Sequence, residues 1–299
     1  MADFAHADPA ELARALATHD DYRVVKRYQK PDQYAPLPDN REAVKTGIYL
    51  DVETTGFDHG ADHIIELAMV KFSFSSDGTL YRLGDEYDEL NDPGVPIPAE
   101  ITRITGITDE MVNGESFDAQ VIEAFIQDAS IIVAHNAGFD RKFVEASFPF
   151  FANKAWACSV AQIDWREAGF ESAKLEYLAY RQGFFYSGHR AVTDCLAGIH
   201  VLSYTLDDQP ALAELLNTAR RKGFRLWAAN APFESKDVLK SRGYRWNSGA
   251  DGRPKAWYKD LGDTELDEEQ AFLESNVYGG QRSLPVDTIN AFNRFSARI

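Results

Sequence analysis

A short apolar run that ends in two carboxylates constrains this chain more than any other feature. Residues 48–53 read Ile-Tyr-Leu-Asp-Val-Glu, which is typical of a buried strand, and residues 54–56 are typical of a turn. Because side chains alternate along a strand, Asp51 and Glu53 share one face at its C-terminal end. Two ionised carboxylates so close repel each other unless a cation lies between them, and oxygen ligands suit Mg²⁺ or Mn²⁺.

Further apolar runs predict an α/β domain around this strand. A meander of three strands followed by alternating helices and strands predicts a mixed sheet packed against helices. The expected strands span 64–72, 79–90 and 131–134, and the expected helices span 10–18, 118–128, 140–146, 175–181 and 190–204.

Charge separates the C-terminal part of the chain from the rest. The 299 residues carry a formal net charge of −16, which argues against a general nucleic-acid coat protein. Residues 219–259 nevertheless hold eleven Lys and Arg against three Asp and Glu, a local charge of +8. We therefore predict an N-terminal extension over 1–45, a main domain over 46–206 and a small basic, aromatic α+β domain over 207–299.

The C-terminal domain is expected to build its own small core. The expected elements are a strand at 223–229, a helix at 233–242, a strand or hairpin at 244–258 and a helix at 268–278. Its predicted core packs Trp246 with Trp257 and Leu239.

The composition predicts a cytoplasmic protein that does not enter a membrane. The chain holds two cysteines, too few for a disulfide scaffold, and no apolar run approaches the roughly 20 residues of a spanning helix. Its first residues show no cationic segment followed by an apolar one, so no secretory signal is expected.

Two later blocks carry acids in a similar context. Asp140 ends a strand–turn–helix block at 133–140, and Asp194 lies near the start of an amphipathic helix, five residues after His189. Taken singly, each has an ordinary explanation, because the helix dipole favours an acid in a first turn and exposed helix acids are common. The three blocks in order are far more specific than any one of them.

The order Asp-x-Glu, Asp and His-x-x-x-x-Asp resembles the DEDDh branch of the DnaQ-like 3′→5′ exonuclease superfamily. The resemblance covers roughly residues 46–205 and rests on blocks 50–56, 132–140 and 189–194. It implies a ribonuclease H-like fold, with a mixed five-stranded sheet flanked by helices. The sister branch has a tyrosine where this chain has Arg190, which favours the histidine branch.

The resemblance also implies roles for single residues. Asp51 would bridge two Mg²⁺ or Mn²⁺ ions, Glu53 and Asp194 would bind the ion that activates water, and Asp140 would serve the second ion. His189, beside the flexible Gly188, would be the general base. The residues implied in substrate binding are Thr54, Thr55, Gly56, Phe57, Thr105, Met111 and Asn136; many relatives have His at the place of Thr105.

These features predict a two-metal-ion 3′→5′ exonuclease acting at 3′ ends of single-stranded or frayed nucleic acid. DNA is favoured over RNA, and the expected products are nucleoside 5′-monophosphates. Two cations can stabilise the attacking and leaving oxygens of phosphodiester hydrolysis, and an imidazole can accept the proton of the water. The alternative is a non-catalytic module that grips nucleic-acid ends or a partner, although a pure binder gains nothing from four carboxylates against phosphate.

The C-terminal segment resembles a small uncharacterised module appended to DNA-processing proteins. Its cations predict docking of the nucleic-acid backbone, and a protein partner is the alternative. The residues predicted to dock the substrate are Lys236, Lys240, Arg242, Arg245 and Lys255.

Overall fold

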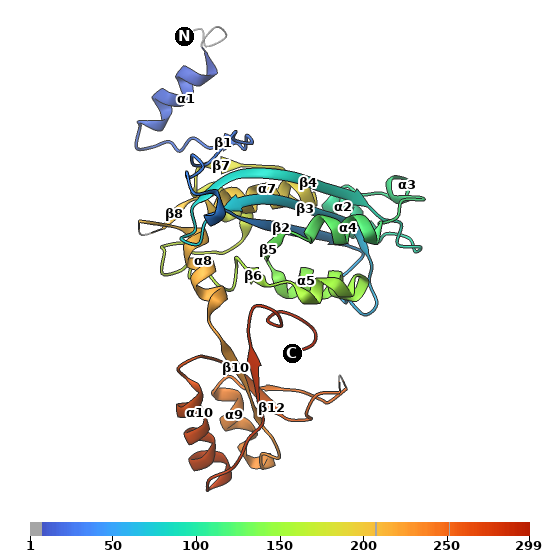
Figure 1. The fold of residues 1–299 in the computed structure, drawn as a ribbon, viewed down its shortest axis with the longest axis vertical. Helices are drawn as coiled ribbons and strands as arrows, with labels where there is room; N and C mark the ends of the chain where they lie inside the picture. The colour runs from blue at the N-terminus through green and yellow to red at the C-terminus, as the bar shows by residue number, and fades with distance from the viewer. Residues whose placement is uncertain (1–7, 207, 251) are drawn as a thin grey trace.

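The computed structural model describes residues 8–206, 208–250 and 252–299. A large layered α/β unit holds the N-terminal two thirds of the chain, and a smaller sheet with its own helices lies beyond α8 (Ala211–Arg220), as Figure 1 shows. Within the described residues, no helix is both long and apolar enough to cross a bilayer.

The large unit is built on a five-stranded mixed sheet in the order β4-β3-β2-β5-β6. The first three strands along the chain form an antiparallel meander, and β5 and β6 then add in parallel. The strands are β2 (Lys45–Thr54), β3 (Ile64–Phe74), β4 (Leu80–Leu90), β5 (Ala129–Ala134) and β6 (Trp156–Cys158). The predicted mixed five-stranded sheet is thereby confirmed.

Helices cover both faces of this sheet because its central strands are apolar on both sides. Tyr49 and Val70 pack in one core with α6 (Leu175–Arg181), α7 (Ala191–Leu202) and α8. Leu50 and Met69 face the other way and pack with α4 (Ala119–Ile126) and α5 (Ala137–Ser147). Since Asp51 and Glu53 follow Tyr49 at the period of two, they lie on the α7 side.

A glycine allows α7 to approach the sheet closely. A Cβ built on Gly198 would lie 2.2 Å from Cζ of Tyr49, so any larger residue would push the helix away from β2. Asp194 is one helical turn earlier on α7. This close contact therefore fixes the distance between Asp194 and the acids of β2.

Most predicted elements of the large unit form within a few residues of their expected ends. The helix expected at 118–128 is α4, capped by the Asp118 side chain, which accepts hydrogen bonds from the backbone of Gln120 and Val121. The helix expected at 140–146 begins earlier, at Ala137, so Asp140 lies inside its first turn. The three-residue β6 was not located by sequence patterns.

The N-terminal residues and α8 both attach to the large unit. The helix expected at 10–18 is α1 (Pro9–Ala17), and β1 (Lys26–Arg27) pairs in parallel with β7 (Phe184–Phe185). Leu212 and Leu215 of α8 are fully buried in the same core as Tyr49. Packing of the large unit thus continues past residue 206, while the predicted division at 45 and 206 stays a prediction.

The smaller unit is a four-stranded antiparallel sheet with helices on one face. Its strands are ordered β11-β12-β10-β13, and β13 was not expected. They are β10 (Gly223–Ala228), β11 (Arg245–Trp246), β12 (Trp257–Gly262) and β13 (Val286–Ile289). The helix expected at 233–242 is a 3₁₀ turn followed by α9 (Lys236–Ser241), and the helix expected at 268–278 is α10 (Leu266–Leu273) followed by a π turn.

The prediction that Trp246 is a core residue is wrong. Its side chain is 51% exposed and lies edge-on to Trp257, with ring centroids 5.5 Å apart. The short edge strand β11 leaves it outside the sheet. The fully buried tryptophan of this unit is instead Trp227 on the central strand β10.

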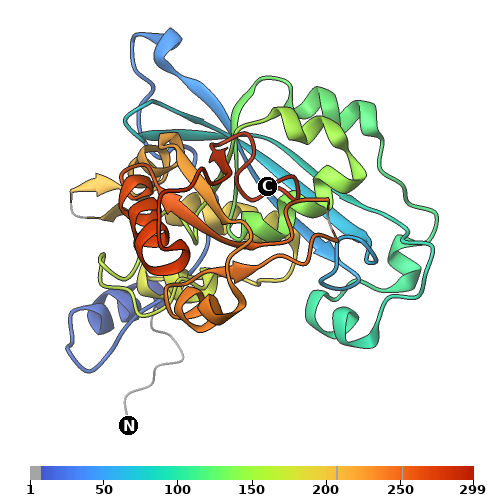
Figure 2. The ribbon, with the colours of Figure 1, turned by 90° about the horizontal axis from the view of Figure 1, so that it is seen from below.

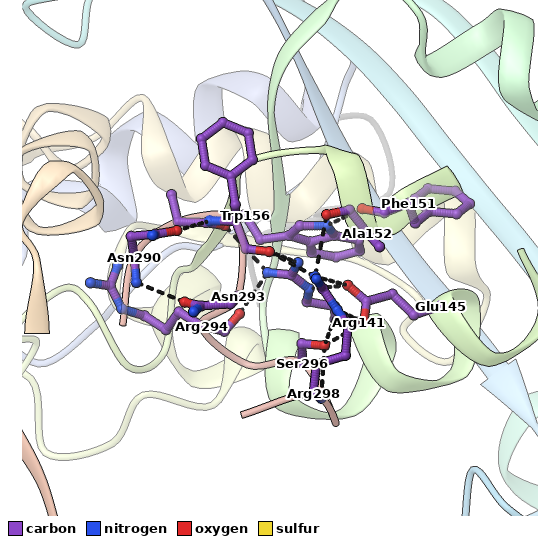
Figure 3. Close-up of polar contacts among 12 residues, drawn as sticks. Arg141, Glu145, Phe151, Ala152, Trp156, Asn290, Asn293, Arg294, Ser296 and Arg298 are labelled. Carbon is purple, nitrogen blue, oxygen red and sulfur yellow. Dashed lines mark hydrogen bonds and ion pairs between the residues drawn. The ribbon is translucent and has the colours of Figure 1, made fainter. Parts of the chain in front are cut away.

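After β13 the chain returns to the large unit and is held there by one buried cation. Arg141 of α5 is fully buried, and its guanidinium donates hydrogen bonds to the carbonyls of Ala291, Phe292 and Arg294 at 2.6–3.3 Å (Figure 3). The backbone N–H of Trp156 donates to the carbonyl of Ala291 at 2.8 Å. The last residues therefore tie the two units together beside α5 (Figures 1 and 2).

Candidate active site

Three of the predicted metal ligands meet at the C-terminal end of β2. Asp51 and Glu53 project from the strand towards α7, and Asp194 projects from the first turn of α7. One carboxylate oxygen from each lies within 4.8 Å of the others. Such an all-oxygen set, near enough for one ion to contact each member, suits a hard divalent cation.

Asp140 approaches the same strand end from the other side of the sheet. It is 3% exposed, and its Oδ1 accepts a hydrogen bond from the backbone N–H of Val52 at 3.2 Å. Val52 lies between the two acids of β2. This hydrogen bond therefore places Asp140, the fourth predicted ligand, beside the strand that carries Asp51 and Glu53. Asp140 is not a member of the cluster formed by Asp51, Glu53 and Asp194.

The loop before α7 is bound to Asp194 through both carboxylate oxygens. The Tyr186 hydroxyl donates to Oδ1 at 3.0 Å, and the backbone N–H of His189 donates to Oδ2 at 2.8 Å. His189 adopts a left-handed backbone conformation, with φ of 66°, and its side chain is exposed. The backbone of His189 is thus held beside the acids, and its side chain is exposed to solvent. Tyr186 was not identified from sequence; its only signal is its place in an aromatic run shortly before His189.

Glu66 on β3 anchors the start of α7. It is fully buried opposite Glu53 in the strand register, and it accepts hydrogen bonds from Arg190 Nε at 2.8 Å and from the backbone of Ala191 at 2.9 Å. Because Arg190 directly follows His189, this ion pair also fixes the loop that carries the imidazole. Sequence patterns could not identify this pair, because Glu66 and Arg190 lie 124 residues apart in the chain.

Burial and mutual repulsion raise the pKa values of the clustered carboxyl groups when no cation is bound. Burial, followed by repulsion from Asp194, raises the pKa of Glu53 to about 8. Burial likewise raises the pKa of Asp140 to about 7, and burial together with repulsion from Asp140 raises the pKa of Asp51. A bound divalent ion would remove both penalties, so the donor set fits the metal that the sequence predicted.

The stability of the metal-free protein is expected to fall as pH rises through this range. A carboxyl whose pKa is higher in the folded than in the unfolded protein lowers the free energy of unfolding once it ionises. For Glu53 this loss of stability is absent below about pH 4, near the pKa of the unfolded state, and complete above about pH 8. We expect the Tm of the metal-free protein to fall between about pH 5 and pH 8. We also expect Mg²⁺ or Mn²⁺ to raise the Tm more at the higher pH, because the ligands must lose protons to bind.

Thermal unfolding followed by circular dichroism, with chelator or metal present, checks this expectation. Glu53→Gln serves as the control, because the amide does not titrate and the decline should become shallower. A variant whose Tm falls with pH as steeply as that of the wild type would contradict the assignment of the effect to this cluster.

The predicted substrate-binding residues are spread over three places. Thr54, the last residue of β2, and Thr55, in the turn that follows, are both buried, and the Thr54 hydroxyl donates to the Gly56 carbonyl at 2.6 Å. Phe57, in the same turn, is 86% exposed and lies against Phe139 with ring centroids 6.2 Å apart. Asn136, also exposed, begins the same helix as Phe139.

The other two predicted substrate-binding residues lie on short helices beyond β4. Thr105 is the last residue of α2 (Ala99–Thr105), where its hydroxyl donates to the Ile101 carbonyl at 3.0 Å. Met111 belongs to α3 (Asp109–Val112) and is 38% exposed. Ile107 and Val112, which flank these residues, pack on Ile65 of β3. The Thr105 hydroxyl is therefore engaged within its own helix, whereas the Met111 side chain is partly exposed, and the role of both residues in substrate binding stays a prediction.

The predicted docking cations differ in how far they are neutralised. Arg242 donates to Glu269 at 2.9 Å and lies 3.7 Å from the centroid of the Phe272 ring. Arg245 pairs with Asp260 at 3.2 Å but remains largely exposed. The lysines of the set are Lys236, Lys240 and Lys255, of which Lys240 and Lys255 are exposed and Lys236 lies 5.4 Å from the centroid of the Phe233 ring.

A family model confirms the class of protein that this fold and acid set indicate. Residues 48–202 match the model of the RNase_T family, described as exonuclease. The chain belongs to this exonuclease family, within the DnaQ-like 3′→5′ exonuclease superfamily of ribonuclease H-like fold. The predicted superfamily is thereby confirmed, and residues 48–202 are identified as an exonuclease domain.

Curated relatives match the same region. The chain is 32% identical over 164 residues to the PolC-type DNA polymerase III of Clostridium perfringens, and 36% identical over 132 residues to that of Thermotoga petrophila. The matched segments cover 53% and 44% of this chain but 11% and 9% of those proteins. The chain thus spans about a tenth of the length of the curated relatives it matches.

Solved structures of exonucleases are also similar. Escherichia coli exonuclease I in complex with an oligonucleotide is 17% identical with a TM-score of 0.47, and the match covers 73% of this chain and 63% of that one. Exonuclease X in complex with 5′-overhanging duplex DNA is 22% identical with a TM-score of 0.40, covering 56% of this chain and 99% of that one.

Proposed function

We propose that this protein is a metal-dependent 3′→5′ exonuclease that removes nucleoside 5′-monophosphates from single-stranded or frayed DNA ends. The observation that carries the proposal is the convergence of Asp51, Glu53 and Asp194 within 4.8 Å, directly beside the loop of His189. Asp194 lies more than 140 residues after Asp51 and Glu53 in the chain, and only folding brings it to them. Their arrangement provides a place for divalent ions and, next to it, a group that can accept a proton.

Each residue of the site has a distinct task in this reaction. Asp51, Glu53 and Asp194 would hold the ions, with Asp140 serving a second ion from the far side of β2. When bound, two divalent ions lower the pKa of an attacking water and stabilise the charge that develops on the phosphate. His189 accepts the proton of that water, because its side chain is solvent-accessible and a neutral imidazole is a base near neutral pH. Tyr186 and Glu66 position the Asp194 carboxylate and the His189 loop.

The proposal that the substrate is DNA rests on the names of the curated relatives. The matching segments belong to proteins named DNA polymerase III, whose substrate is DNA by name. The local charge of +8 over residues 219–259 supports a polyanionic substrate in an otherwise acidic chain. A protein partner for the C-terminal unit has no corresponding support in the comparisons.

Digestion of end-labelled oligonucleotides tests the proposal. With Mg²⁺ or Mn²⁺, a 5′-labelled strand should give a descending ladder, and a 3′-labelled strand should release labelled mononucleotide at once. Parallel digestion of DNA and RNA of one sequence measures the preference for the sugar. Release of mononucleotide from the 5′ end would reverse the proposed polarity, and end binding without turnover at every metal concentration would favour the non-catalytic alternative.

Replacing His189 with alanine is expected to slow hydrolysis by about 10²- to 10⁴-fold, the usual contribution of a general base. Because the acids are untouched, the rise of the Tm on adding metal should remain. Single-turnover digestion and thermal unfolding measure the two effects separately. His63→Ala, which removes another exposed imidazole from the loop after β2, is the matched control and should retain activity. Equal rates for the two variants would remove His189 from the mechanism.

A further inference from the structure

A cavity of about 530 Å³ separates the two units of the protein on the side of α5. Its walls come from three separate segments: Lys142 on α5, Arg225 and Arg245 on the small sheet, and Arg294 on the returning tail. The segment between β11 and β12 adds Arg253 to this lining. The cavity therefore lies where α5, the small sheet and the returning tail meet.

The face of the small sheet that meets this cavity is the one its helices leave uncovered. Leu226 and Leu261 point to the other face, where they pack with Leu239 of α9 and Leu273 of α10. Because side chains alternate along a strand, Arg225 of β10 must point away from those helices. Tyr258 lies directly opposite Trp227 in the register, on this same helix-free face, and the Arg225 guanidinium lies 4.4 Å from the Tyr258 ring centroid.

The charges around the cavity do not cancel. Among the described lining residues, Asp260 is the one acidic side chain, and it pairs with both Arg225, at 2.6 and 2.8 Å, and Arg245, at 3.2 Å. Arg294 donates to the backbone carbonyls of Ala219 and Arg221, which leave its charge in place. Five basic side chains (Lys142, Arg225, Arg245, Arg253 and Arg294) thus line the cavity beside this one acidic side chain, in a chain whose formal net charge is −16.

The cavity is connected to the acid cluster along a single helix. Gly138 and Lys142 of α5 line the cavity, while Asp140, between them, turns its carboxylate to Val52 on β2. Phe139 packs on the exposed Phe57 at the mouth of the predicted site. A strand that leaves the acids would therefore pass aromatic rings first and cations next, and single-stranded nucleic acid binds through base stacking and backbone pairing of this kind.

We infer that this cavity binds the phosphodiester backbone of the nucleic-acid strand that precedes its 3′ terminus. The inference rests on the proposed function, because it needs a strand whose end lies at the acids. It also changes the set of docking residues. Arg245 stays in the set, and Lys142, Arg225 and Arg294 join it. Lys236 and Lys240 leave it, because they belong to α9, which lies on the opposite face of the small sheet.

Binding of single-stranded DNA to the full-length protein in chelator, without turnover, tests the inference. The probe is a 5′-labelled oligonucleotide of about 20 nucleotides, which exceeds a single short site, and its Kd is measured by anisotropy at several salt concentrations. Lys142→Gln combined with Arg245→Gln should weaken binding roughly tenfold at low salt. The same double variant should also reduce the salt slope by about 1.4, or about 0.7 for each lost phosphate contact.

The matched variant is Lys236→Gln combined with Lys240→Gln, which removes the same charge from α9 of the same unit. It should bind with the wild-type salt slope, and both variants should show the wild-type circular dichroism spectrum and Tm. An equal loss in the α9 variant, or no loss in the cavity variant, overturns the inference. Failure of the proposed function would be seen in the digestion experiment instead: the wild-type protein would bind the strand but release no mononucleotide with Mg²⁺ or Mn²⁺.

Discussion

Asp51→Asn is expected to lower the rate of 3′-terminal hydrolysis by about a thousandfold. Asp51 is the acid that the other ligands surround: its carboxylate lies among those of Glu53 and Asp194, and Asp140 approaches from behind the strand. Metal stabilisation of the transition state is worth several kcal/mol, and each 1.4 kcal/mol corresponds to about tenfold in rate. An amide at this position leaves the shape of the site intact but weakens its hold on a divalent ion.

The measurement is single-turnover digestion of a labelled strand with saturating Mg²⁺ or Mn²⁺. The metal-free variant should unfold at the same or a higher Tm than the wild type, because the substitution removes a buried carboxyl whose pKa is raised by burial and by Asp140. Glu123→Gln, a neutral replacement of an exposed acid on α4, is the control and should cleave at the wild-type rate. Undiminished cleavage by the Asp51 variant would show that the chemistry takes place elsewhere.

Arg141→Met is expected to cost about 3–5 kcal/mol of the free energy of unfolding, as when one member of a buried charged pair is removed. Arg141 is fully buried, donates to three carbonyls of the tail and pairs with Glu145 at 2.6 Å (Figure 3). Methionine fills a similar volume but leaves these acceptors without a donor in the interior. The tail should detach, and the cavity between the two units should open.

Denaturant unfolding and limited proteolysis measure the two consequences of this substitution. Arg298→Met is the matched control, since Arg298 bonds to the same Glu145 but is half exposed, and its loss should cost about 1 kcal/mol or less. Release of the residues after β13 by protease should be faster in the Arg141 variant. A smaller loss for Arg141 than for Arg298 would show that the tail does not depend on the buried cation.

These positions also limit which truncations are informative. The sequence places a boundary near residue 206, but α8 follows it and buries Leu212 and Leu215 in the core of the large unit. A chain cut at 206 would expose that core, so loss of binding by such a fragment would say little about the basic unit. Point substitutions in the full chain separate stability from binding.

Local patterns were sufficient for the elements that are long and apolar. The strand at 48–53, the two strands that follow it and the helix at 175–181 have periodicities that few other structures satisfy. Sequence patterns did not locate the short strands β6 and β13, because three and four residues are too few to show a period. Trp246 was misplaced for a related reason, since exposure at a sheet edge depends on which strand is its neighbour.

The sequence by itself determined the family, the sheet and the acids that the proposed chemistry needs, because spacing along strands and helices fixes which side chains share a face. Folding alone decided which distant groups support them: Glu66 meets Arg190, Tyr186 meets Asp194, and Arg141 binds a tail about 150 residues away. Contacts of that kind depend on how whole layers pack, and no local period encodes them. The basic cavity belongs to the same category, since its walls become neighbours only when the tail docks beside α5.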